Sequence, residues 1–287
     1  MKNILVVFDY SGTLSLKAPI FACPDNLLRE LEQTGLTALG ITTPSIFWED
    51  IVNPSWQEGS TTQAGYKKVM EDRIRERMGR NSITFDETVI SAAVCRFVDD
   101  YMSRSPIDDH WRGILSLLQD TPCTRTVIAT DHYAEATEAI ITHLKDLGIK
   151  AVRLRDALTK SVEKPAFMVA NSADIGAHKS DRVFWTVIRN ALGTDQFQNI
   201  VLVDDFGFNE RTEDAYGDRE TVKKRQQSTV NLVQEVFSGK VITIPFIAEV
   251  PDGGAFKLHS IDIDQQFGPL IERSSAMIAD DLKKSVL

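Results

Sequence analysis

The sequence predicts an α/β fold in which a parallel sheet is covered by helices on both faces. Continuous apolar, β-branched runs are typical of strands buried on both faces, and the sequence has four such runs with a weaker fifth. The four runs are 4–8, 126–130, 200–203 and 241–244, and the weaker one is 151–154. Helical patterns lie between the runs, and this alternation of strands and helices indicates a parallel sheet.

The helices between these strands are predicted from the spacing of apolar residues and from stop signals. They cover 134–147, 181–192 and 221–237. Ser180 is placed to cap the second helix, and Gly193 is placed to end it. A last helix over 269–284 follows a turn signal at 251–254, and we expect this helix to dock on the core.

A long segment breaks the alternation directly after the first strand. It has helical patterns over 26–33, 64–78 and 87–102 and no buried-strand run. We therefore predict a helical cap domain over 16–105, inserted into a core formed by 1–15 and 106–287.

The composition excludes several classes of protein. With 43% hydrophobic and 25% charged residues, the chain is neither disordered nor fibrous, and its net charge of −9 disfavours nonspecific binding to nucleic acid or anionic lipid. No apolar run reaches the roughly 18 residues of a membrane helix, and the N-terminal run is too short for a signal peptide. The three cysteines have no CxxC spacing, so a disulfide framework or a zinc site is not indicated. We expect a cytoplasmic enzyme or binding protein for small molecules, without nucleic-acid or membrane partners. The oligomeric state is left open.

Carboxylate, hydroxyl and lysine side chains are concentrated at the ends of the buried runs. In parallel sheets, ligands bind at the carboxyl ends of the strands, so these side chains should share one edge. The residues concerned are Asp9, Thr130, Asp131, Lys179, Asp204, Asp205 and Glu210. Lys179 is expected at the start of the helix that precedes the third strand.

This grouping suits phosphoryl transfer. A carboxylate such as Asp9 can attack phosphorus and form an aspartyl-phosphate. Crowded carboxylates repel each other and the phosphate, so a divalent cation is needed, and hard oxygen ligands favour Mg²⁺. Lys179 and Thr130 are expected to hold the phosphoryl oxygens, and Lys179 is expected to keep Asp9 ionised. Gly12 allows backbone N–H groups to approach the phosphate closely.

The same residues resemble the motifs of the haloacid dehalogenase (HAD) superfamily of phosphohydrolases. In family order, the matching pieces are Phe8-Asp9-Tyr10-Ser11-Gly12-Thr13-Leu14, the strand closed by Thr130, Lys179 within His178-Lys179-Ser180-Asp181, and Val203-Asp204-Asp205-Phe206-Gly207-Phe208-Asn209-Glu210. The superfamily also inserts a helical cap just after its first motif. The resemblance implies a Rossmann-like core, dependence on Mg²⁺ and a small phosphorylated metabolite as substrate.

The resemblance also implies roles for individual residues. Asp9 is the nucleophile, and Asp9, Ser11 and Lys179 form the catalytic set. The phosphate-binding set is Ser11, Gly12, Thr130, Asp131 and Lys179. Mg²⁺ is held by the Asp9 side chain, the Ser11 backbone carbonyl and Asp205, while Asp204 or Glu210 acts through water.

Position 11 departs from the pattern of this superfamily. Most of its phosphatases carry a second aspartate there as general acid and base, and a serine hydroxyl cannot donate a proton in that way. General acid–base help is worth about 10²–10⁴-fold in rate. The leaving group therefore needs no protonation, or another residue supplies the acid, or turnover is slow. A phosphonatase-like C–P hydrolase and a catalytically weakened protein that binds a phosphorylated ligand or a protein partner are the alternative functions.

Several residues have competing interpretations. Lys164 precedes Pro165 and mimics a common family dipeptide, but Lys179 is preferred because one helix separates it from the strand that ends in Asp205. His132 lies beside the predicted site and is a possible replacement acid, although a surface histidine is the more ordinary interpretation.

In the insertion, aromatic residues either line a substrate pocket or pack within the cap; Trp48, Trp56 and Tyr66 are the candidates. Lys67 and Lys68 suggest a Schiff-base lysine, but adjacent lysines on a polar helix face are usually solvated.

Overall fold

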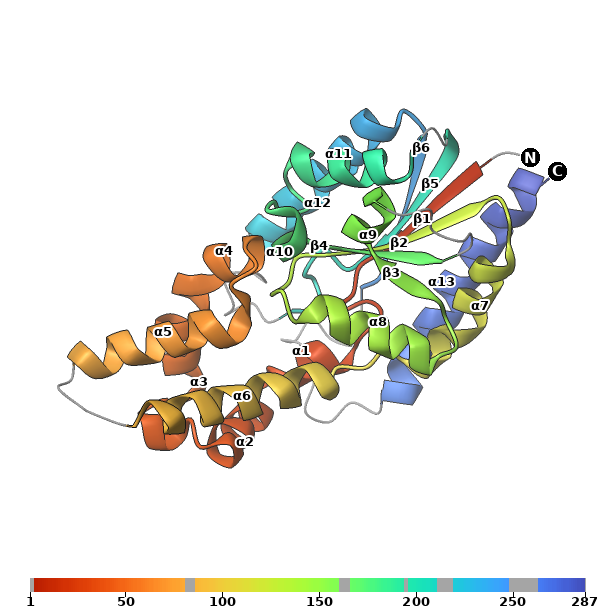
Figure 1. The fold of residues 1–287 in the computed structure, drawn as a ribbon. Coiled ribbons are helices and arrows are strands. Elements are labelled where there is room, and N and C mark those ends of the chain that lie inside the picture. The colour runs from red at the N-terminus through yellow and green to blue at the C-terminus, as the bar shows by residue number, and fades with distance from the viewer. Residues whose placement is uncertain are drawn as a thin grey trace.

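The computed structural model describes residues 3–80, 86–159, 166–193, 196–210, 219–247 and 263–286. Within these ranges, six strands form one sheet: β1 (Asn3–Phe8), β2 (Thr124–Thr130), β3 (Ala151–Arg153), β4 (Phe167–Asn171), β5 (Phe197–Asp204) and β6 (Lys240–Pro245). Their order is β3-β4-β2-β1-β5-β6, and all neighbouring pairs are parallel (Figure 1). The predicted α/β class with a parallel sheet is confirmed.

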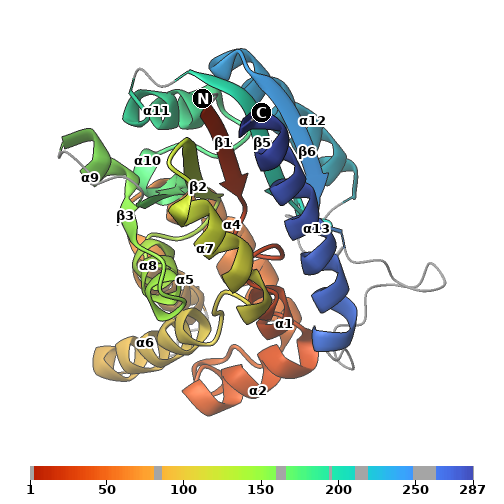
Figure 2. The same ribbon diagram turned by 90° about the vertical axis from the view of Figure 1, so that its right-hand side faces the viewer.

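Helices cover both faces of this sheet (Figures 1 and 2). They are η3 (Asp109–Trp111), α7 (Arg112–Asp120), α8 (Ala136–Asp146), α9 (Leu154–Thr159), α10 (Ser172–Ile175), α11 (Arg182–Ala191), α12 (Arg219–Phe237) and α13 (Ile263–Val286). Side chains of a strand alternate between its two faces. In β1, Ile4, Val6 and Phe8 join the apolar cluster of α7, α8 and α13, whereas Leu5 and Val7 join that of α11 and α12. The sheet is therefore buried between two helical layers.

The segment between β1 and η3 contains helices and no strand among its described residues. Its elements are α1 (Lys17–Phe21), α2 (Pro24–Thr34), η1 (Thr37–Leu39), α3 (Pro44–Ile46), the π-helix η2 (Phe47–Val52), α4 (Asn53–Thr61), α5 (Gly65–Arg80) and α6 (Glu87–Ser103). Residues 17–103 are called the helical insertion below. It projects from the carboxyl edge of the sheet (Figure 1). The helical character predicted for this segment is confirmed, while its status as a separate domain over 16–105 stays a prediction.

Some sequence expectations differ from the structure. The buried strand β4 was not expected, and it lies between β3 and β2. Asp181 rather than Ser180 caps α11, because its Oδ1 accepts a hydrogen bond from the backbone N–H of Val183 at 2.8 Å. Lys179 lies in the turn before this helix and not at its start. The turn signal at 251–254 and Lys164 lie outside the described residues.

The C-terminal helix is longer than expected and begins before Pro269, which lies inside α13. Its apolar residues Ile271, Ile278 and Leu282 are buried against the sheet, so the prediction that this helix docks on the core is confirmed. Among the described helices, none has the length and apolar content needed to cross a bilayer.

The strand order determines where a ligand binds. β1 lies between β2 and β5; the chain leaves the carboxyl end of β1 toward β2 and that of β5 toward β6, so the connections from these two neighbouring strands run in opposite directions. Such a switch point opens a crevice outside the strand ends. Phe8, the last residue of β1, pairs with Val203 of β5 and with Ile128 of β2. The residues that follow these three strands therefore meet at one level.

Candidate active site

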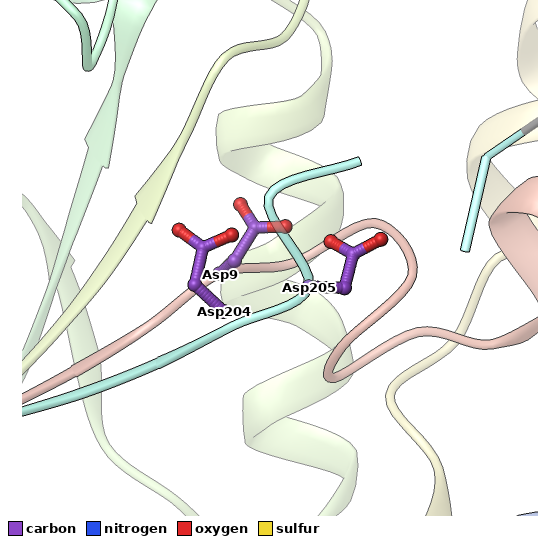
Figure 3. A group of neighbouring side chains, drawn as sticks. All are labelled: Asp9, Asp204 and Asp205. Atoms are coloured by element: carbon purple, nitrogen blue, oxygen red, sulfur yellow. The ribbon is translucent and has the colours of Figure 1, made fainter. Parts of the chain in front are cut away.

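Three buried carboxylates meet at the ends of β1 and β5. Asp9 follows β1, Asp204 ends β5, and Asp205 follows it. One carboxylate oxygen from each lies within 4.8 Å of the others (Figure 3). The backbone holds the two strands together here, because the N–H of Asp9 donates to the carbonyl of Val203 at 2.9 Å. The carboxylates that the sequence placed on one edge are thus brought together by adjacent strands.

Lys179 joins two of these carboxylates. Its Nζ lies 2.7 Å from Asp9 Oδ1 and 2.9 Å from Asp204 Oδ2. Two hydrogen bonds fix the backbone of Lys179 in its turn. The N–H of Lys179 donates to Asp131 Oδ1 at 2.8 Å, and the carbonyl of Lys179 accepts from Trp185 Nε1 at 2.6 Å. The lysine side chain is buried, so its ammonium group is an integral part of the site.

The protonation of this group depends on burial. Burial raises the pKa of Asp9 to about 7, against the opposing effect of the Lys179 ammonium, and the charge of Asp204 adds to the rise. Burial together with the charges of Asp9 and Asp204 also raises the pKa of Asp205 well above its ordinary value. The contact expected to keep Asp9 ionised is present, but burial outweighs it.

The donor set fits a divalent cation. Three carboxylates carry three negative charges when ionised, and Lys179 neutralises only one of them. A hard dication would balance the remaining charge and would favour the ionised carboxylates, and oxygen ligands of this kind suit Mg²⁺. Both oxygens of Asp204 accept hydrogen bonds, one from Lys179 and one from the Phe206 N–H at 2.6 Å. Asp9 and Asp205 are therefore the better direct ligands, and Asp204 mainly orients its neighbours.

The loop after β1 is shaped to lie against Asp205. Gly12 has φ +75°, and a Cβ at this position would lie 2.6 Å from Asp205 Oδ2. The Thr13 hydroxyl accepts the backbone N–H of Asp205 at 3.0 Å. The buried Asn209 amide donates to the carbonyls of Gly12 and Phe246, and its backbone N–H donates to Asp205 Oδ2 at 2.9 Å. Only glycine permits this close approach of the loop to the carboxylate.

Thr130 and Asp131 lie at the end of β2, on the other side of Asp9. Both are buried and line the same cavity as Asp9. The Asp131 carboxylate holds the backbone of Lys179, as described above. The structure therefore places the predicted phosphate-binding residues around Asp9, and their contacts with phosphate stay predictions.

Ser11 and Glu210 are paired. The Ser11 hydroxyl donates to Glu210 Oε1 at 2.8 Å, and both residues line the cavity beside Asp9. The position at which the sequence departs from the motif it resembles thus holds a hydroxyl directed at a neighbouring carboxylate. Glu210 is not among the three carboxylates within 4.8 Å of one another, which agrees with an indirect role toward a metal.

Comparison with solved structures identifies the architecture. A 2-haloacid dehalogenase from Pseudomonas syringae pv. Tomato DC3000 matches with a TM-score of 0.50 and 14% identity, over 95% of this chain and 99% of that one. The chain has a haloacid dehalogenase-like fold. An L-2-haloacid dehalogenase is also similar, with a TM-score of 0.45 and 11% identity over 85% of this chain and 84% of that one. So is the HAD-hydrolase YfnB from Bacillus subtilis, solved with magnesium, with a TM-score of 0.39 and 15% identity over 71% of this chain and 81% of that one. No protein-family model and no curated protein matches the sequence. At these identities the likeness concerns the fold, and function depends on the site.

In this haloacid dehalogenase-like fold, a cavity of about 250 Å³ lies between the helical insertion and the carboxyl edge of the sheet. Asp9, Ser11, Thr130 and Glu210 line its core end. The insertion contributes mostly aromatic side chains, which are Phe21, Phe47, Trp48, Trp56, Tyr66, Phe97 and Tyr101. The aromatic residues singled out in the sequence therefore do line a pocket. Tyr66 also packs within the fold, because it stacks on Tyr133 with ring centroids 3.9 Å apart.

A second cavity of about 390 Å³ adjoins the first and shares Trp56, Asp131 and Arg225 with it. Its lining is polar apart from Trp56, and it includes Lys224 and several hydroxyl groups. The aromatic lining is thus a property of the cavity that contains Asp9.

His132 is buried, whereas the sequence favours a surface position for it. The backbone N–H of Tyr133 donates to its Nδ1 at 2.9 Å, and the Tyr101 hydroxyl lies 3.1 Å from its Nε2. Burial lowers the pKa of His132 to about 4. The ring is neutral near pH 7, with its proton on Nε2, and it is not a general acid with an ordinary pKa.

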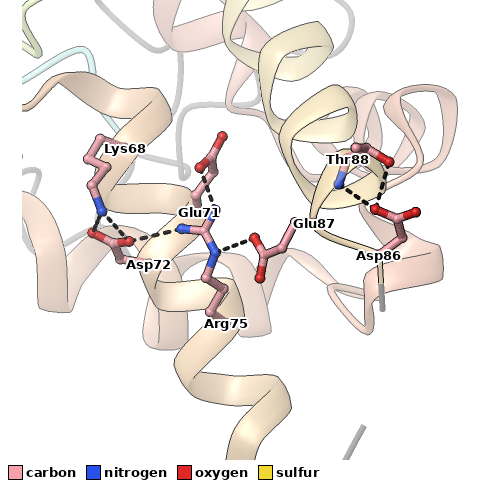
Figure 4. A network of polar contacts seen from close by, with 7 residues as sticks. All are labelled: Lys68, Glu71, Asp72, Arg75, Asp86, Glu87 and Thr88. Atoms are coloured by element: carbon pink, nitrogen blue, oxygen red, sulfur yellow. Dashed lines mark hydrogen bonds and ion pairs between the residues drawn. The ribbon is translucent and has the colours of Figure 1, made fainter. Parts of the chain in front are cut away.

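The lysines of the insertion are engaged at its surface. Lys67 pairs with Asp99 at 2.6 Å, and this hydrogen bond raises the pKa of Lys67. Lys68 pairs with Asp72 in a network that also joins α5 to the start of α6 through Arg75 (Figure 4). Neither lysine lines the cavity with Asp9, so the structure does not favour a Schiff-base role for them.

A carboxylate of the core caps a helix of the insertion. Glu135 accepts the backbone N–H groups of Tyr66 at 2.7 Å and Lys67 at 3.1 Å, at the start of α5. Gln63 also crosses to the core, where its side-chain amide donates to Asp174 Oδ1 at 2.7 Å. These contacts hold the insertion over the cavity.

Sequence reasoning missed several residues that build the site. Asn209 and Thr13 lie inside the matching motifs, close to the glycines Gly207 and Gly12, and these polar side chains were a usable signal. Glu135 was not identifiable, because its partners lie about 70 residues away in the chain.

Proposed function

We propose that this chain is a Mg²⁺-dependent phosphohydrolase that transfers the phosphoryl group of a small phosphorylated metabolite to Asp9. The observation that carries the proposal is the group of three carboxylates within 4.8 Å of one another, two of which are joined by the buried Lys179. A nucleophile, an ammonium group and a set of hard oxygen ligands in one crevice are the components that phosphoryl transfer requires.

The first step uses Asp9 as the attacking group. A carboxylate oxygen forms a bond to phosphorus while the bond from phosphorus to the leaving oxygen breaks. Lys179 Nζ, 2.7 Å from Asp9 Oδ1, favours the ionised nucleophile and attracts the phosphoryl oxygens. Thr130 and the backbone N–H groups around Gly12 orient the phosphoryl group. Asp9 and Asp205 would hold Mg²⁺, which would supply charge neutralisation for the phosphoryl oxygens.

In the second step, water attacks phosphorus of the aspartyl-phosphate and releases inorganic phosphate and Asp9. The buried position of Asp9 under the helical insertion limits access to this intermediate. Glu210, which accepts a hydrogen bond from Ser11, lines the same cavity as Asp9.

The experiment is a measurement of inorganic phosphate release from a panel of phosphate esters, with Mg²⁺ and with excess chelator. Phosphate release that requires Mg²⁺ and is lost in Asp9→Asn supports the proposal. The exposed Asp120→Asn is the matched control and should keep full activity. Metal-independent release of halide from 2-haloacids, without phosphate release from any ester, would replace the proposal with a dehalogenase function.

The pairing of Ser11 with Glu210 favours a second candidate function. Without a carboxylic acid at position 11, the site could retain a phosphorylated ligand without turning it over. In that case phosphate esters would bind in the presence of Mg²⁺, as measured by calorimetry, and no phosphate would be released over hours.

A further inference from the structure

The shape of the cavity and the residue at position 11 both restrict the substrate. This inference about the substrate class rests on the proposed phosphohydrolase function. The two observations are independent, because one concerns the wall of the helical insertion and the other concerns the loop after β1.

The wall selects an apolar, planar group. Phe47 and Trp48 come from η2 and Phe97 comes from α6, and all three face the cavity that contains Asp9. Among the described lining residues of the insertion, Asn53 alone has an amide or charged side chain. A sugar phosphate would bring several hydroxyl groups against this wall, and each buried hydroxyl without a partner is costly. An aromatic ring gains from edge and face contacts with the same side chains.

The size is consistent with one ring. An apolar cavity of about 150 Å³ holds a benzene molecule. The cavity here has about 250 Å³, which leaves room for a phosphoryl group beside a single ring. The phosphoryl group belongs at the core end, where Asp9 and Thr130 lie.

The loop after β1 selects a leaving group that departs without a proton. The Ser11 hydroxyl is directed at Glu210 Oε1, and a serine hydroxyl is not an acid near pH 7. His132 accepts the Tyr133 N–H through Nδ1 and faces Tyr101 through Nε2. Neither residue protonates an alkoxide, and Glu210 Oε1 accepts the hydrogen bond of Ser11, so this oxygen carries no proton to donate. A phenol has a pKa of about 10, as in tyrosine, far below that of an aliphatic alcohol, so a phenolate leaves without this help.

We propose that the substrate is the phosphomonoester of a small phenol, whose ring lies against the aromatic wall of the helical insertion while its phosphoryl group meets Asp9. Asp9 forms a bond to phosphorus, the bond from phosphorus to the phenolic oxygen breaks, and the electron pair leaves with the phenolate, which takes a proton from water. A second water molecule then attacks phosphorus, loses its proton to solvent and releases inorganic phosphate and the Asp9 carboxylate.

Four substrates separate the two parts of the proposal. Phenyl phosphate has the ring and the good leaving group, benzyl phosphate has the ring and a poor leaving group, acetyl phosphate has a good leaving group without a ring, and glycerol 3-phosphate has neither. With Mg²⁺, we expect kcat/KM to be highest for phenyl phosphate. Benzyl phosphate should be slower by about 10²-fold or more, the range that general acid catalysis supplies.

Two variants test whether Ser11 and the aromatic wall cause this substrate preference. Ser11→Asp should narrow the difference between phenyl and benzyl phosphate to less than about tenfold, because the added carboxylic acid helps only the poor leaving group. Trp48→Ala should raise KM for phenyl phosphate more than for acetyl phosphate, because it removes part of the ring's wall.

The proposal is overturned if benzyl phosphate is hydrolysed as fast as phenyl phosphate, if acetyl phosphate or glycerol 3-phosphate is the best substrate, or if Trp48→Ala affects phenyl and acetyl phosphate equally. These outcomes leave the phosphohydrolase function intact. If neither these four substrates nor any ester of the wider panel releases phosphate with Mg²⁺, the proposed function itself fails, and the substrate class fails with it.

Discussion

The ammonium group of Lys179 lies 2.7 Å from Oδ1 of Asp9, a residue 170 positions earlier in the chain. Both side chains are buried, and the same ammonium group also contacts Asp204. The site is therefore assembled only when β1, β5 and the turn before α11 come together. Folding and the charge balance of the site depend on the same contact.

The first prediction concerns this lysine. Lys179→Met keeps a long apolar stem and removes the charge, which leaves Asp9 and Asp204 buried without their cation. Removing one partner of a buried ion pair typically costs about 3–5 kcal/mol, so we expect a loss of this size in the free energy of unfolding, measured by urea denaturation without Mg²⁺. Phosphate release should also be lost.

The exposed Lys145→Met is the control and should change stability by less than about 0.5 kcal/mol. A Lys179→Met protein with unchanged stability and activity would show that the buried contact has no role.

The second prediction concerns Gly12. A Cβ there would lie 2.6 Å from Asp205 Oδ2, and the residue has φ +75°. Gly12→Ala should therefore displace Asp205 and reduce Mg²⁺ affinity by about 10-fold or more, in the range found when residues that support a metal ligand are changed. Calorimetric titration with MgCl₂ measures this effect.

Gly113→Ala is the matched control for Gly12→Ala. Gly113 lies in α7, and a Cβ there meets nothing within 4 Å, so alanine should leave Mg²⁺ affinity unchanged and stabilise the helix slightly. Equal Mg²⁺ affinity in both variants would argue against Asp205 as a metal ligand.

The third prediction concerns His132 and pH. Burial lowers its pKa to about 4, from an ordinary value of 6.5. Between these values the unfolded chain binds a proton that the folded chain does not, so this residue makes the free energy of unfolding fall as the pH decreases. From pH 7 to pH 5 the contribution is about 2 kcal/mol. His132→Gln should lack this part of the pH dependence.

The comparison is made by urea denaturation of both proteins at pH 7 and pH 5. The buried carboxyls act in the opposite sense, because their raised pKa values favour the folded state at low pH. Only the difference between the two proteins isolates His132. If the wild type and His132→Gln showed identical pH dependence, His132 would be protonated equally in the folded and unfolded states.

The fourth prediction concerns the contact between core and insertion. Glu135→Ala removes the acceptor for two N–H groups at the start of α5. Loss of an N-terminal cap costs about 0.5–2 kcal/mol, and we expect faster proteolytic cleavage in the insertion than in the wild type. Glu32→Ala, at an exposed position of α2, is the control. Equal cleavage rates in the two variants would contradict a role for Glu135 in holding the insertion.

The parallel sheet and one edge of the site were predictable because both depend on local signals. The runs that became β1, β2 and β5 are continuous and apolar, and the polar residues of interest follow them directly. Asp9, Thr130 and Asp205 could therefore be placed at the same edge by strand topology alone.

Other features depend on contacts that sequence spacing does not encode. β4 has the short run Phe167–Asn171, which resembles a buried helix segment as much as a strand. Ser180 and Asp181 are both good cap residues by type, and only the tertiary position of the turn selects Asp181. The aromatic wall could not be distinguished from ordinary packing, because its members come from separate helices.

The central claim is that Asp9 accepts the phosphoryl group, and trapping the intermediate tests it most directly. Protein quenched during turnover of phenyl phosphate with Mg²⁺ is treated with borohydride, which reduces an acyl phosphate to an alcohol, and the peptides are analysed by mass spectrometry. We expect residue 9 to be converted to homoserine in the presence of both substrate and Mg²⁺, and to remain aspartate when either is omitted. Phosphate release without modification at residue 9, or with modification of another carboxylate, would contradict the claim.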